Sequence, residues 1–369
     1  MEKINVYYHD NIVGYLAKYE DVYAFQYDEN WLKRGFSISP FSLPLRGCVF
    51  IPKKSVFNGF YGVFADSQPD QWGNLLLDRY LKKQGISKID GLIRLSLIGR
   101  SGMGALEYEP NHEMKEDLSF DLDKYQKETN NILNHQDEDI DYLYYFGGSS
   151  GGARPKALVN INNEDWIVKF ESRFDFKEIG KCEYDYALAC KEIGIDMPEV
   201  KLFQSNTNTG YFGIKRFDRV NGAKIHMITA AALLEVDFRS PCLDYSDLFK
   251  LTNILTNNNL IDIKNLFLRM CFNVYAHNLD DHAKNFSYLY DESTKSYRLS
   301  PAYDMVYSNT YYKEHTTSIN GKGTNILDTD LIKVGKVAGL DERYMKESIN
   351  KVKDIVRIRL SKYLLKMVE

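Results

Sequence analysis

The chain has 369 residues, of which 44% are hydrophobic and 14% aromatic, so it can bury the cores of two or three packed units. Its 47 basic and 51 acidic residues give a formal net charge of −4, which excludes a strong basic field for direct, indiscriminate binding to nucleic acid. The five cysteines form no CxxC pair, which disfavours a disulfide framework and a zinc cluster. Because no signal-peptide-like run or membrane-spanning stretch is present either, a cytoplasmic protein without a membrane partner is expected.

Short β-branched and aromatic runs dominate the first residues. Residues 4–27 read INVYY, NIVGYLAKY and DVYAFQY around turn-forming breaks, which predicts an antiparallel meander. Residues 70–84 place apolar side chains at helical spacing, with Gly85 as a stop, so one helix is expected to pack on that sheet. Residues 107–141 are acidic and show little apolar periodicity, which favours a surface linker around one amphipathic helix.

The sequence beyond this acidic stretch predicts a pair of strands, a helix and another strand. ALVNINN and DWIVKFES indicate a β-hairpin, residues 179–193 a helix, and YFGIKRFDR a further strand. From Ile225 onward helical periodicity dominates, and helices are expected at 229–234, 245–255, 261–276 and 341–367.

These elements predict an α+β protein with a small N-terminal β-rich subdomain and a mostly helical C-terminal lobe. The expected segments are a β-rich subdomain at 1–110, an acidic linker with a helix at 111–140, strands and a helix around a Gly-rich loop at 141–224, and a helical lobe at 225–369. A strand pair, a helix and a strand before a helical lobe is the order of a two-lobed, divergent protein-kinase-like fold.

The segment HNLDDHAKN, residues 277–285, carries the strongest chemical signal. Phosphoryl transfer needs a carboxylate that orients or deprotonates the attacking hydroxyl and an oxygen ligand for Mg²⁺; protein kinases supply these as Asp and, five residues on, Asn. Asp280 and Asn285 have this spacing. Asp304, in YRLSPAYDM, stands where a kinase has its second metal-binding carboxylate, although Phe-Gly does not follow it. The pattern predicts a catalytic base, Asp280, and two metal ligands.

A different interpretation of this segment is a hydrolase metal site. His277, Asp280, Asp281 and His282 offer imidazole and carboxylate ligands that suit Zn²⁺ or Mn²⁺. No other His-rich segment completes the ligand set, so the kinase interpretation is preferred.

Two further patterns precede this segment. FGGSSGGARPKA, residues 146–157, could be a flexible turn, or a loop whose backbone N–H groups, serines and Lys156 hold phosphate oxygens. Lys169 in WIVKF and Glu183 in the next helix could be two solvated side chains, or the ion pair with which kinases hold the α- and β-phosphates of ATP. The order of all these features along the chain favours the kinase alternatives.

The motifs GGSSGGARPK, GIKRFDR, NLDDHAKNFS and YRLSPAYDM resemble those of HipA-like serine/threonine kinases, and VYYHDNIVGYLA, SLPL and LIGRSGMGALEYEP resemble the N-terminal subdomain of the same family. The resemblance implies that a loop covers the ATP phosphates and that Lys215, Arg216 and Phe217 offer backbone groups to adenine. It also implies that Ser149 is autophosphorylated, with Ser150 as an alternative acceptor, and that this event expels the loop and switches the kinase off. The implied ATP-binding residues are Ser150, Gly151, Gly152, Ala153, Arg154, Lys156, Lys169, Glu183, Lys215, Arg216, Phe217, Asp218, His282 and Lys284. The segment DSQPDQWGN departs from a more apolar family segment.

The resemblance further implies an ATP- and Mg²⁺-dependent kinase that is the toxin of a type II toxin–antitoxin pair. Its implied partner is a small helix-turn-helix antitoxin that binds DNA, so that DNA is contacted only indirectly. Family substrates include aminoacyl-tRNA synthetases, and no residue here selects one. Two alternatives stay open: a small-molecule kinase of the choline or aminoglycoside kinase type, and a pseudokinase that only binds an antitoxin.

Overall fold

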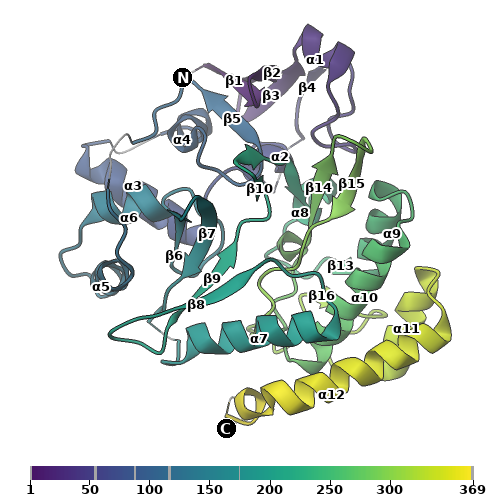
Figure 1. Ribbon diagram of the computed structural model, residues 1–369. Helices are drawn as coiled ribbons and strands as arrows, with labels where there is room; N and C mark the ends of the chain where they lie inside the picture. Colours follow the sequence, from purple (N-terminus) through teal and green to yellow (C-terminus); the bar gives the residue numbers. More distant parts are fainter. Residues whose placement is uncertain (1, 54–55, 87–88, 115–117, 174, 367–369) are drawn as a thin grey trace. The chain divides into compact units, whose positions relative to one another are not determined.

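The computed structural model describes residues 2–53, 56–86, 89–114, 118–173 and 175–366. The chain forms two compact units (Figure 1). The first unit comprises Met1–Gly180, Lys201–Ile228 and Ala232–Glu235, and the second comprises Lys181–Val200, Thr229–Ala231 and Val236–Glu369. Among the described residues, no helix has both the length and the apolar content needed to cross a membrane.

The first unit begins with the predicted meander, extended by two strands into a five-stranded sheet of order β4-β3-β2-β1-β5. Its strands are β1 Lys3–Tyr8, β2 Asn11–Tyr19, β3 Val22–Tyr27, β4 Val49–Phe50 and β5 Leu106–Glu109. Alternate residues such as Val6, Leu16 and Phe25 are fully buried, because successive side chains of a strand point to opposite faces. The expected antiparallel pairing of the first three strands is confirmed.

Six helices are described in this part of the first unit. They are α1 Glu29–Arg34, α2 Gly62–Ala65, α3 Gln71–Lys83, α4 Gly91–Ile98, α5 Leu122–Leu133 and α6 Ile140–Gly147. Helix α3 is the helix predicted at 70–84, whereas α4 and α6 were not predicted. The amphipathic helix expected in the acidic linker is α5, and its Tyr125 and Ile132 are buried in one apolar cluster with Trp72 of α3 and Leu143 of α6.

A second sheet of the first unit carries the predicted hairpin. Its order is β6-β7-β9-β8, with β6 Lys156–Ile161, β7 Glu164–Lys169, β9 Tyr211–Lys215 and β8 Val200–Phe203. A short pair, β10 Arg219–Val220 and β11 Ala223–Lys224, follows β9. Ala157 pairs with Val168 and Val159 with Trp166, and all four side chains are buried on the face that joins the apolar cluster. The alternation predicted for the hairpin is therefore confirmed.

The second unit is mostly helical, as expected. Most of α7 Ile179–Ile193 belongs to it, together with α9 Tyr245–Leu255, α10 Leu260–Tyr275, α11 Asp328–Val337 and α12 Glu342–Lys366. It also holds the hairpin of β14 Ser287–Asp291 and β15 Ser296–Leu299 and the parallel pair of β13 Leu243–Asp244 and β16 Thr317–Ser318. β12 Met227–Thr229 and α8 Ala230–Leu234 contain residues of both units.

Helix α10 is the core element of the second unit. Leu266, Phe267, Met270 and Phe272 are fully buried, and the helix packs against α9, α11 and α12. Because it is apolar on most of its circumference, α10 is enclosed by its neighbours, and its C-terminal end is thereby fixed. The residues that follow this end form the segment HNLDDHAKN.

Candidate active site

The loop that follows α10, residues 276–286, carries Asp280 and Asn285 and is called here the catalytic loop. It ends in a 3-10 turn over Ala283–Asn285. Asp280 is exposed, with 53% of its side-chain surface accessible. The Asn285 side-chain amide donates a hydrogen bond to the backbone carbonyl of Asp280 at 2.7 Å. This bond occupies the nitrogen end of the amide and leaves the Oδ1 end as the candidate metal ligand.

Two basic side chains flank Asp280. The Nε2 atom of His282 lies 3.8 Å from a carboxylate oxygen of Asp280, and its ring packs near Phe238 at a centroid distance of 5.2 Å. The Nζ atom of Lys284 lies 5.0 Å from the centroid of the same Phe238 ring. The two side chains predicted to line the phosphate side therefore share one aromatic support next to the predicted base.

Asp281 holds the catalytic loop in place through hydrogen bonds to two other segments. Its side chain is buried, and its Oδ2 atom accepts hydrogen bonds from the Tyr245 hydroxyl at 3.0 Å and from His315 Nδ1 at 2.9 Å. Its Oδ1 atom accepts from the backbone N–H of Thr317 at 3.1 Å, and the Thr317 hydroxyl donates to the Asp281 carbonyl at 2.6 Å. Burial and the charge of Asp281 raise the pKa of Tyr245, which keeps this donor protonated.

Asp304 lies on a segment that pairs with the catalytic loop. The Asn278 side chain donates to the Asp304 carbonyl at 3.2 Å, and the backbone N–H of Leu279 donates to the Ser308 carbonyl at 3.0 Å. Asp304 has a φ of 53°, a left-handed conformation that costs energy for a residue with a Cβ and that is concentrated at functional sites. Thus the structure links the segments of Asp280, Asn285 and Asp304 within the second unit.

The donor set of these segments fits Mg²⁺. Among the described residues, no group of three or more His, Cys, Asp or Glu side chains could hold a metal ion by itself. An Asn oxygen and one carboxylate are instead the kind of partial protein shell that Mg²⁺ accepts, because it usually completes its coordination with substrate phosphates and water. The hydrolase interpretation of His277, Asp280, Asp281 and His282 loses one of its ligands, because the Asp281 carboxylate is bound by Tyr245 and His315.

Residues 147–156, called here the Gly/Ser loop, belong to the first unit and run from the last residue of α6 to the first residue of β6. Ser149 is half-buried, and its hydroxyl lies 3.5 Å from the Ser101 carbonyl. Ser150 is fully buried, and its hydroxyl donates to the Gly147 carbonyl at 2.7 Å. Ala153 is exposed and Gly151 half-buried. At the far end of the loop, Arg154 forms a 3.1 Å ion pair with Asp175 and Lys156 is buried.

The predicted ATP lysine and its predicted partner lie in different units. Lys169 ends β7, opposite Lys156 in the hairpin register, with its Nζ atom 5.6 Å from the centroid of the Phe212 ring. Glu183 lies on α7 and is buried. The ion pair of Lys169 and Glu183 stays a prediction.

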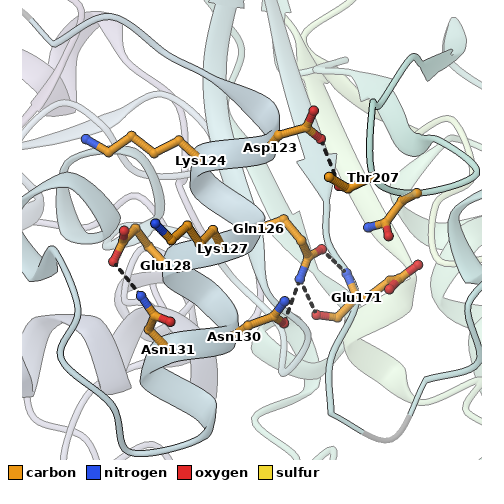
Figure 2. A pocket seen from close by; sticks show the side chains of 10 residues that line it. Asp123, Lys124, Gln126, Lys127, Glu128, Asn130, Asn131, Glu171 and Thr207 are labelled. Carbon is orange, nitrogen blue, oxygen red and sulfur yellow. Dashed lines mark hydrogen bonds between the residues drawn. The ribbon is translucent and has the colours of Figure 1, made fainter.

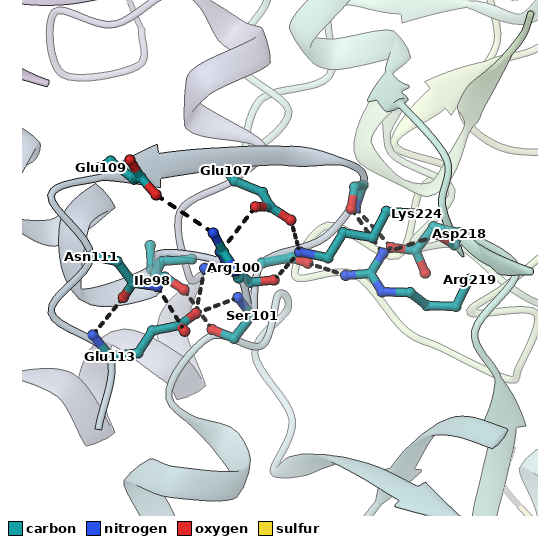
Figure 3. Close-up of polar contacts among 12 residues, drawn as sticks. Ile98, Arg100, Ser101, Glu107, Glu109, Asn111, Glu113, Asp218, Arg219 and Lys224 are labelled. Carbon is teal, nitrogen blue, oxygen red and sulfur yellow. Dashed lines mark hydrogen bonds and ion pairs between the residues drawn. The ribbon is translucent and has the colours of Figure 1, made fainter. Parts of the chain in front are cut away.

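The segment GIKRFDR at the end of β9 holds a buried charge cluster, of which Figure 3 shows Asp218 and Arg219. Arg216 Nη2 and Arg219 Nη1 both lie 2.8 Å from Asp218 Oδ2, which also accepts from the backbone N–H of Gly104 at 2.7 Å. Arg216 and Arg219 in addition donate to the Gly102 carbonyl. Burial opposes the ionisation of Asp218, but the two guanidinium groups outweigh it and lower its pKa to about 2.

This cluster restricts how the segment could contact adenine. The side chains of Arg216 and Asp218 are committed to residues 102–104, and the Arg216 backbone N–H donates to the Asp165 carbonyl at 2.8 Å. Lys215 forms an ion pair with Glu164, and Phe217 is half-buried in the turn before β10. Any adenine contact is therefore left mainly to the remaining backbone groups of residues 215–217.

An open polar depression of about 680 Å³ lies over α5 (Figure 2). Gln126 exchanges two hydrogen bonds with the backbone of Glu171, at 2.9 and 3.2 Å. Asp123 accepts a hydrogen bond from the Thr207 hydroxyl at 3.3 Å. None of the predicted site residues lines this depression. Its polar groups connect surface segments, so it is not assigned to the active site.

Sequence reasoning did not find three residues that shape these loops. Asp281 was considered only as a metal ligand, and Asn278 and Asp70 were not singled out. The Asp70 and Asp281 side chains accept hydrogen bonds from segments far away in sequence, and the Asn278 side chain donates one to such a segment.

A β-rich N-terminal sheet, a second sheet that carries a Gly/Ser loop, and a helical unit with the Asp280 loop define a divergent kinase-like fold. The chain matches the HipA N-terminal domain over residues 4–109 and the HipA-like C-terminal domain over residues 148–358. The protein therefore belongs to the HipA family, and the family resemblance found in the sequence is confirmed.

A solved structure supports the same fold over nearly the whole chain. HipA from Shewanella oneidensis MR-1, solved as a toxin–antitoxin complex with HipB and operator DNA, is 18% identical, with a TM-score of 0.72 over 98% of this chain and 91% of that one.

Two sequence relatives bear names that describe them as candidate kinases. Y4dM of Sinorhizobium fredii is 27% identical over 42% of this chain and 40% of its own length. A Haemophilus influenzae protein is 25% identical over 45% of this chain and 54% of its own length. The chain thus aligns with about half the length of these relatives.

Proposed function

We propose that this protein is an ATP- and Mg²⁺-dependent serine/threonine protein kinase and the toxin of a bacterial type II toxin–antitoxin pair. The observation that carries the proposal is the catalytic loop: an exposed Asp280, an Asn285 hydrogen-bonded to it, and an Asp304 segment tied to the same loop by Asn278. Phosphoryl transfer is achieved mainly by positioning and by electrostatic stabilisation, which suits a loop that is anchored this firmly.

Asp280 would orient the substrate hydroxyl and accept its proton. The hydroxyl oxygen then bonds to the γ-phosphorus as the bond to the β,γ-bridging oxygen breaks, and ADP leaves. Asn285 and Asp304 would hold Mg²⁺, which when bound offsets the phosphate charge. His282 and Lys284 would line the phosphates from the catalytic loop.

Residues of the first unit would bind the phosphates of the nucleotide. Backbone N–H groups of the Gly/Ser loop and the charge of Lys156 would cover the phosphates, Lys169 would hold them, and Ser149 or Ser150 would accept phosphate in autophosphorylation. A phosphoserine adds about −1.5 to −2 charge, which would repel ATP from the same loop and switch the kinase off.

The proposed partner is a small helix-turn-helix antitoxin, through which the chain would reach DNA. The similar structure from Shewanella oneidensis contains HipB and operator DNA, and the formal charge of −4 gives this chain no strong basic field of its own. The proposed substrate is a protein serine or threonine, and aminoacyl-tRNA synthetases are the first candidates to test.

The test is incubation of the purified protein with γ-labelled ATP and Mg²⁺, followed by mass spectrometry of the 147–156 peptide. Phosphate on Ser149 or Ser150 in the parent but not in Asp280→Asn would support a protein kinase. Label transfer only to an added small alcohol would favour the small-molecule kinase. No transfer from a folded protein that binds ATP would favour the pseudokinase.

A further inference from the structure

A chain of buried hydrogen bonds joins Asp281, which holds the catalytic loop, to the segment of Asp304. The Asn273 side-chain amide donates to the Tyr245 hydroxyl oxygen at 2.8 Å. The Asn278 amide in turn donates to the Asn273 Oδ1 atom at 3.0 Å and to the Asp304 carbonyl at 3.2 Å. All these residues belong to the second unit. The term relay is used here for four of these side chains, those of Asp281, Tyr245, Asn273 and Asn278.

The relay lies in the interior of the second unit. Asn273 and Asn278 are each 2% exposed, Asp281 is 1% exposed, and Tyr245 is fully buried. Polar groups that are removed from water need partners within the protein, and successive hydrogen bonds in such an environment strengthen one another. Each member of the relay therefore depends on its neighbours, because water cannot take their place.

The Asp281 carboxylate sets the direction of every bond in the relay. An ionised carboxylate only accepts hydrogen bonds, so the Tyr245 hydroxyl donates its proton to Asp281. The Tyr245 oxygen is then left to accept, which orients the amide nitrogen of Asn273 toward it. The Asn273 Oδ1 atom is thereby placed as the acceptor for Asn278. Reversal of either asparagine amide would break two hydrogen bonds.

The Asn278 amide shows what its orientation depends on. Its nitrogen makes both printed bonds, whereas its buried Oδ1 atom has no hydrogen-bond partner among the residues that the structure describes. Since a buried acceptor without a partner is unfavourable, the two acceptors in front of the nitrogen determine the orientation. One of them is the carbonyl of Asp304, whose φ of 53° is a conformation that its surroundings must support.

Packing alone does not explain Asn273. It lies near the end of α10, where Met270 and Phe272 are fully buried, and asparagine has a lower helix propensity than leucine or methionine. A buried amide is favourable only when its donor and its acceptor are both used. In Asn273 both are used by the relay, which accounts for a polar residue in an apolar helix.

We propose that Asn273 is a positioning residue of the active site. Through the relay it connects Asp281, which holds the catalytic loop, with the backbone of Asp304, the candidate metal ligand. The catalytic base and the metal ligand are thereby set in position together, and the loss of one link loosens the Asp304 segment. The role in metal binding rests on the proposed kinase function, whereas the relay as a structural support does not.

The relay is tested first without nucleotide, by amide hydrogen exchange of the peptide 302–309 in the full chain. Asn273→Leu replaces the amide by an apolar group of similar size, and exchange of this peptide should accelerate about fivefold. Tyr245→Phe removes only the hydroxyl, and exchange should accelerate about threefold. Because Tyr245→Phe is the milder change, it decides the question if Asn273→Leu does not fold.

Thr252→Val is the matched control. Thr252 is fully buried on α9, the helix that carries Tyr245, and its hydroxyl is hydrogen-bonded to that of Tyr288 at 2.8 Å. The control therefore loses a buried hydrogen bond of the same unit outside the relay, and exchange of the peptide 302–309 should stay at the parent rate. Parent-like exchange in the folded relay variants would overturn the relay. Equal acceleration in Thr252→Val would also overturn it, because it would mean general loosening of the unit.

A double variant tests whether the links act as one chain. Asn278→Ala removes the last link to Asp304, so adding Tyr245→Phe to it should accelerate exchange of the peptide 302–309 less than 1.5-fold further. Members of one hydrogen-bond network are expected to show this lack of additivity. A double variant in which the two single effects multiply in full would show two independent contacts and would overturn the relay.

The consequence for the metal ligand is tested by adding ATP and measuring phosphorylation over a series of Mg²⁺ concentrations. In Asn273→Leu the Mg²⁺ concentration for half-maximal phosphorylation should rise about tenfold, whereas the Michaelis constant for ATP at saturating Mg²⁺ should change less than twofold. An unchanged Mg²⁺ requirement, with accelerated exchange, would overturn the positioning role. A complete lack of phosphorylation in the parent would count against the proposed kinase function, and the exchange data would still decide the relay.

Discussion

The catalytic loop and the Gly/Ser loop are held in different ways. Asp281 fixes the catalytic loop through a buried carboxylate that binds Tyr245, His315 and Thr317, three residues from two other segments of the second unit. The Gly/Ser loop is fixed mainly by backbone hydrogen bonds to one helix turn. A buried carboxylate is costly to leave unpaired, whereas a lost backbone hydrogen bond costs less where water can replace the partner.

This difference matches the tasks proposed for the two loops. A base and metal ligands must keep their geometry through the reaction, which requires rigid support. A loop that covers the nucleotide and also carries the acceptor serines must be able to open. Substitutions in the catalytic loop test the rigid side of this contrast.

The largest effect is expected at Asp280. Asp280→Asn removes the proton acceptor without changing the side-chain volume, and autophosphorylation should fall about 1,000-fold. Because Asp280 is exposed, the thermal unfolding midpoint should not change. Single-turnover phosphorylation and calorimetry test this, with Asp291→Asn on the β14–β15 hairpin as the control. A variant that keeps a tenth of the parent rate would disprove the role as base.

The next effect is expected at Asp281, whose replacement tests the anchor of the catalytic loop. Asp281→Ala leaves buried donors of Tyr245, His315 and Thr317 without an acceptor, which should destabilise the second unit by about 3 kcal/mol. Urea unfolding followed by circular dichroism measures the loss. Asp354→Ala, on the exposed face of α12, should change stability by less than about 0.5 kcal/mol.

Enzyme kinetics and unfolding stability together separate the anchoring role of Asp281 from a general effect on stability. In Asp281→Asn, which keeps an acceptor oxygen, the turnover number should fall more than the Michaelis constant for ATP changes, because the loop positions the reacting groups rather than the nucleotide. An unchanged turnover number in a destabilised variant would show a structural role alone.

A smaller effect is expected for Mg²⁺ dependence at Asn285. Asn285→Ala removes the candidate amide ligand, and the Mg²⁺ concentration for half-maximal phosphorylation should rise about tenfold or more. Asn285→Asp retains an oxygen ligand and should require far less additional Mg²⁺. An alanine variant with the parent Mg²⁺ requirement would remove Asn285 from the metal site.

The smallest effect concerns the acid stability of the first unit. The pKa of Asp218 is lowered from 3.8 to about 2 in the folded protein, so its ionisation stabilises the fold above the unfolded pKa. This contribution, about 2 kcal/mol by linkage, is fully present above pH about 5 and is lost as the pH falls from about 4 toward 2.

Tryptophan fluorescence can follow this unfolding, because all three tryptophans, Trp31, Trp72 and Trp166, belong to the first unit. In Asp218→Asn the stability of the first unit should be lower at neutral pH and should change less between pH 5 and pH 3 than in the parent. The exposed Asp137→Asn should retain the parent pH dependence. An identical slope in Asp218→Asn would show that the cluster does not contribute to acid stability.

The elements with clear periodicity could be predicted from the sequence. The meander of residues 4–27, helix α3, the β6–β7 hairpin and helix α9 were all expected, because alternation or helical spacing of apolar residues reflects which face is buried. Helices α4, α6 and α11 were missed because they are short and have weak or interrupted patterns. Propensity alone cannot identify such helices, since their stability comes from packing.

The sequence by itself determined the family and the candidate chemistry, because both depend on residue types at fixed spacing, as in Asp280 and Asn285. Only the tertiary structure decided what holds these residues in place. Hydrogen bonds join Asp281 to His315, Asn278 to the Asp304 carbonyl, and Asp70 to Gly152 across large sequence separations. Such contacts depend on how the chain packs, and no local pattern of residues specifies them.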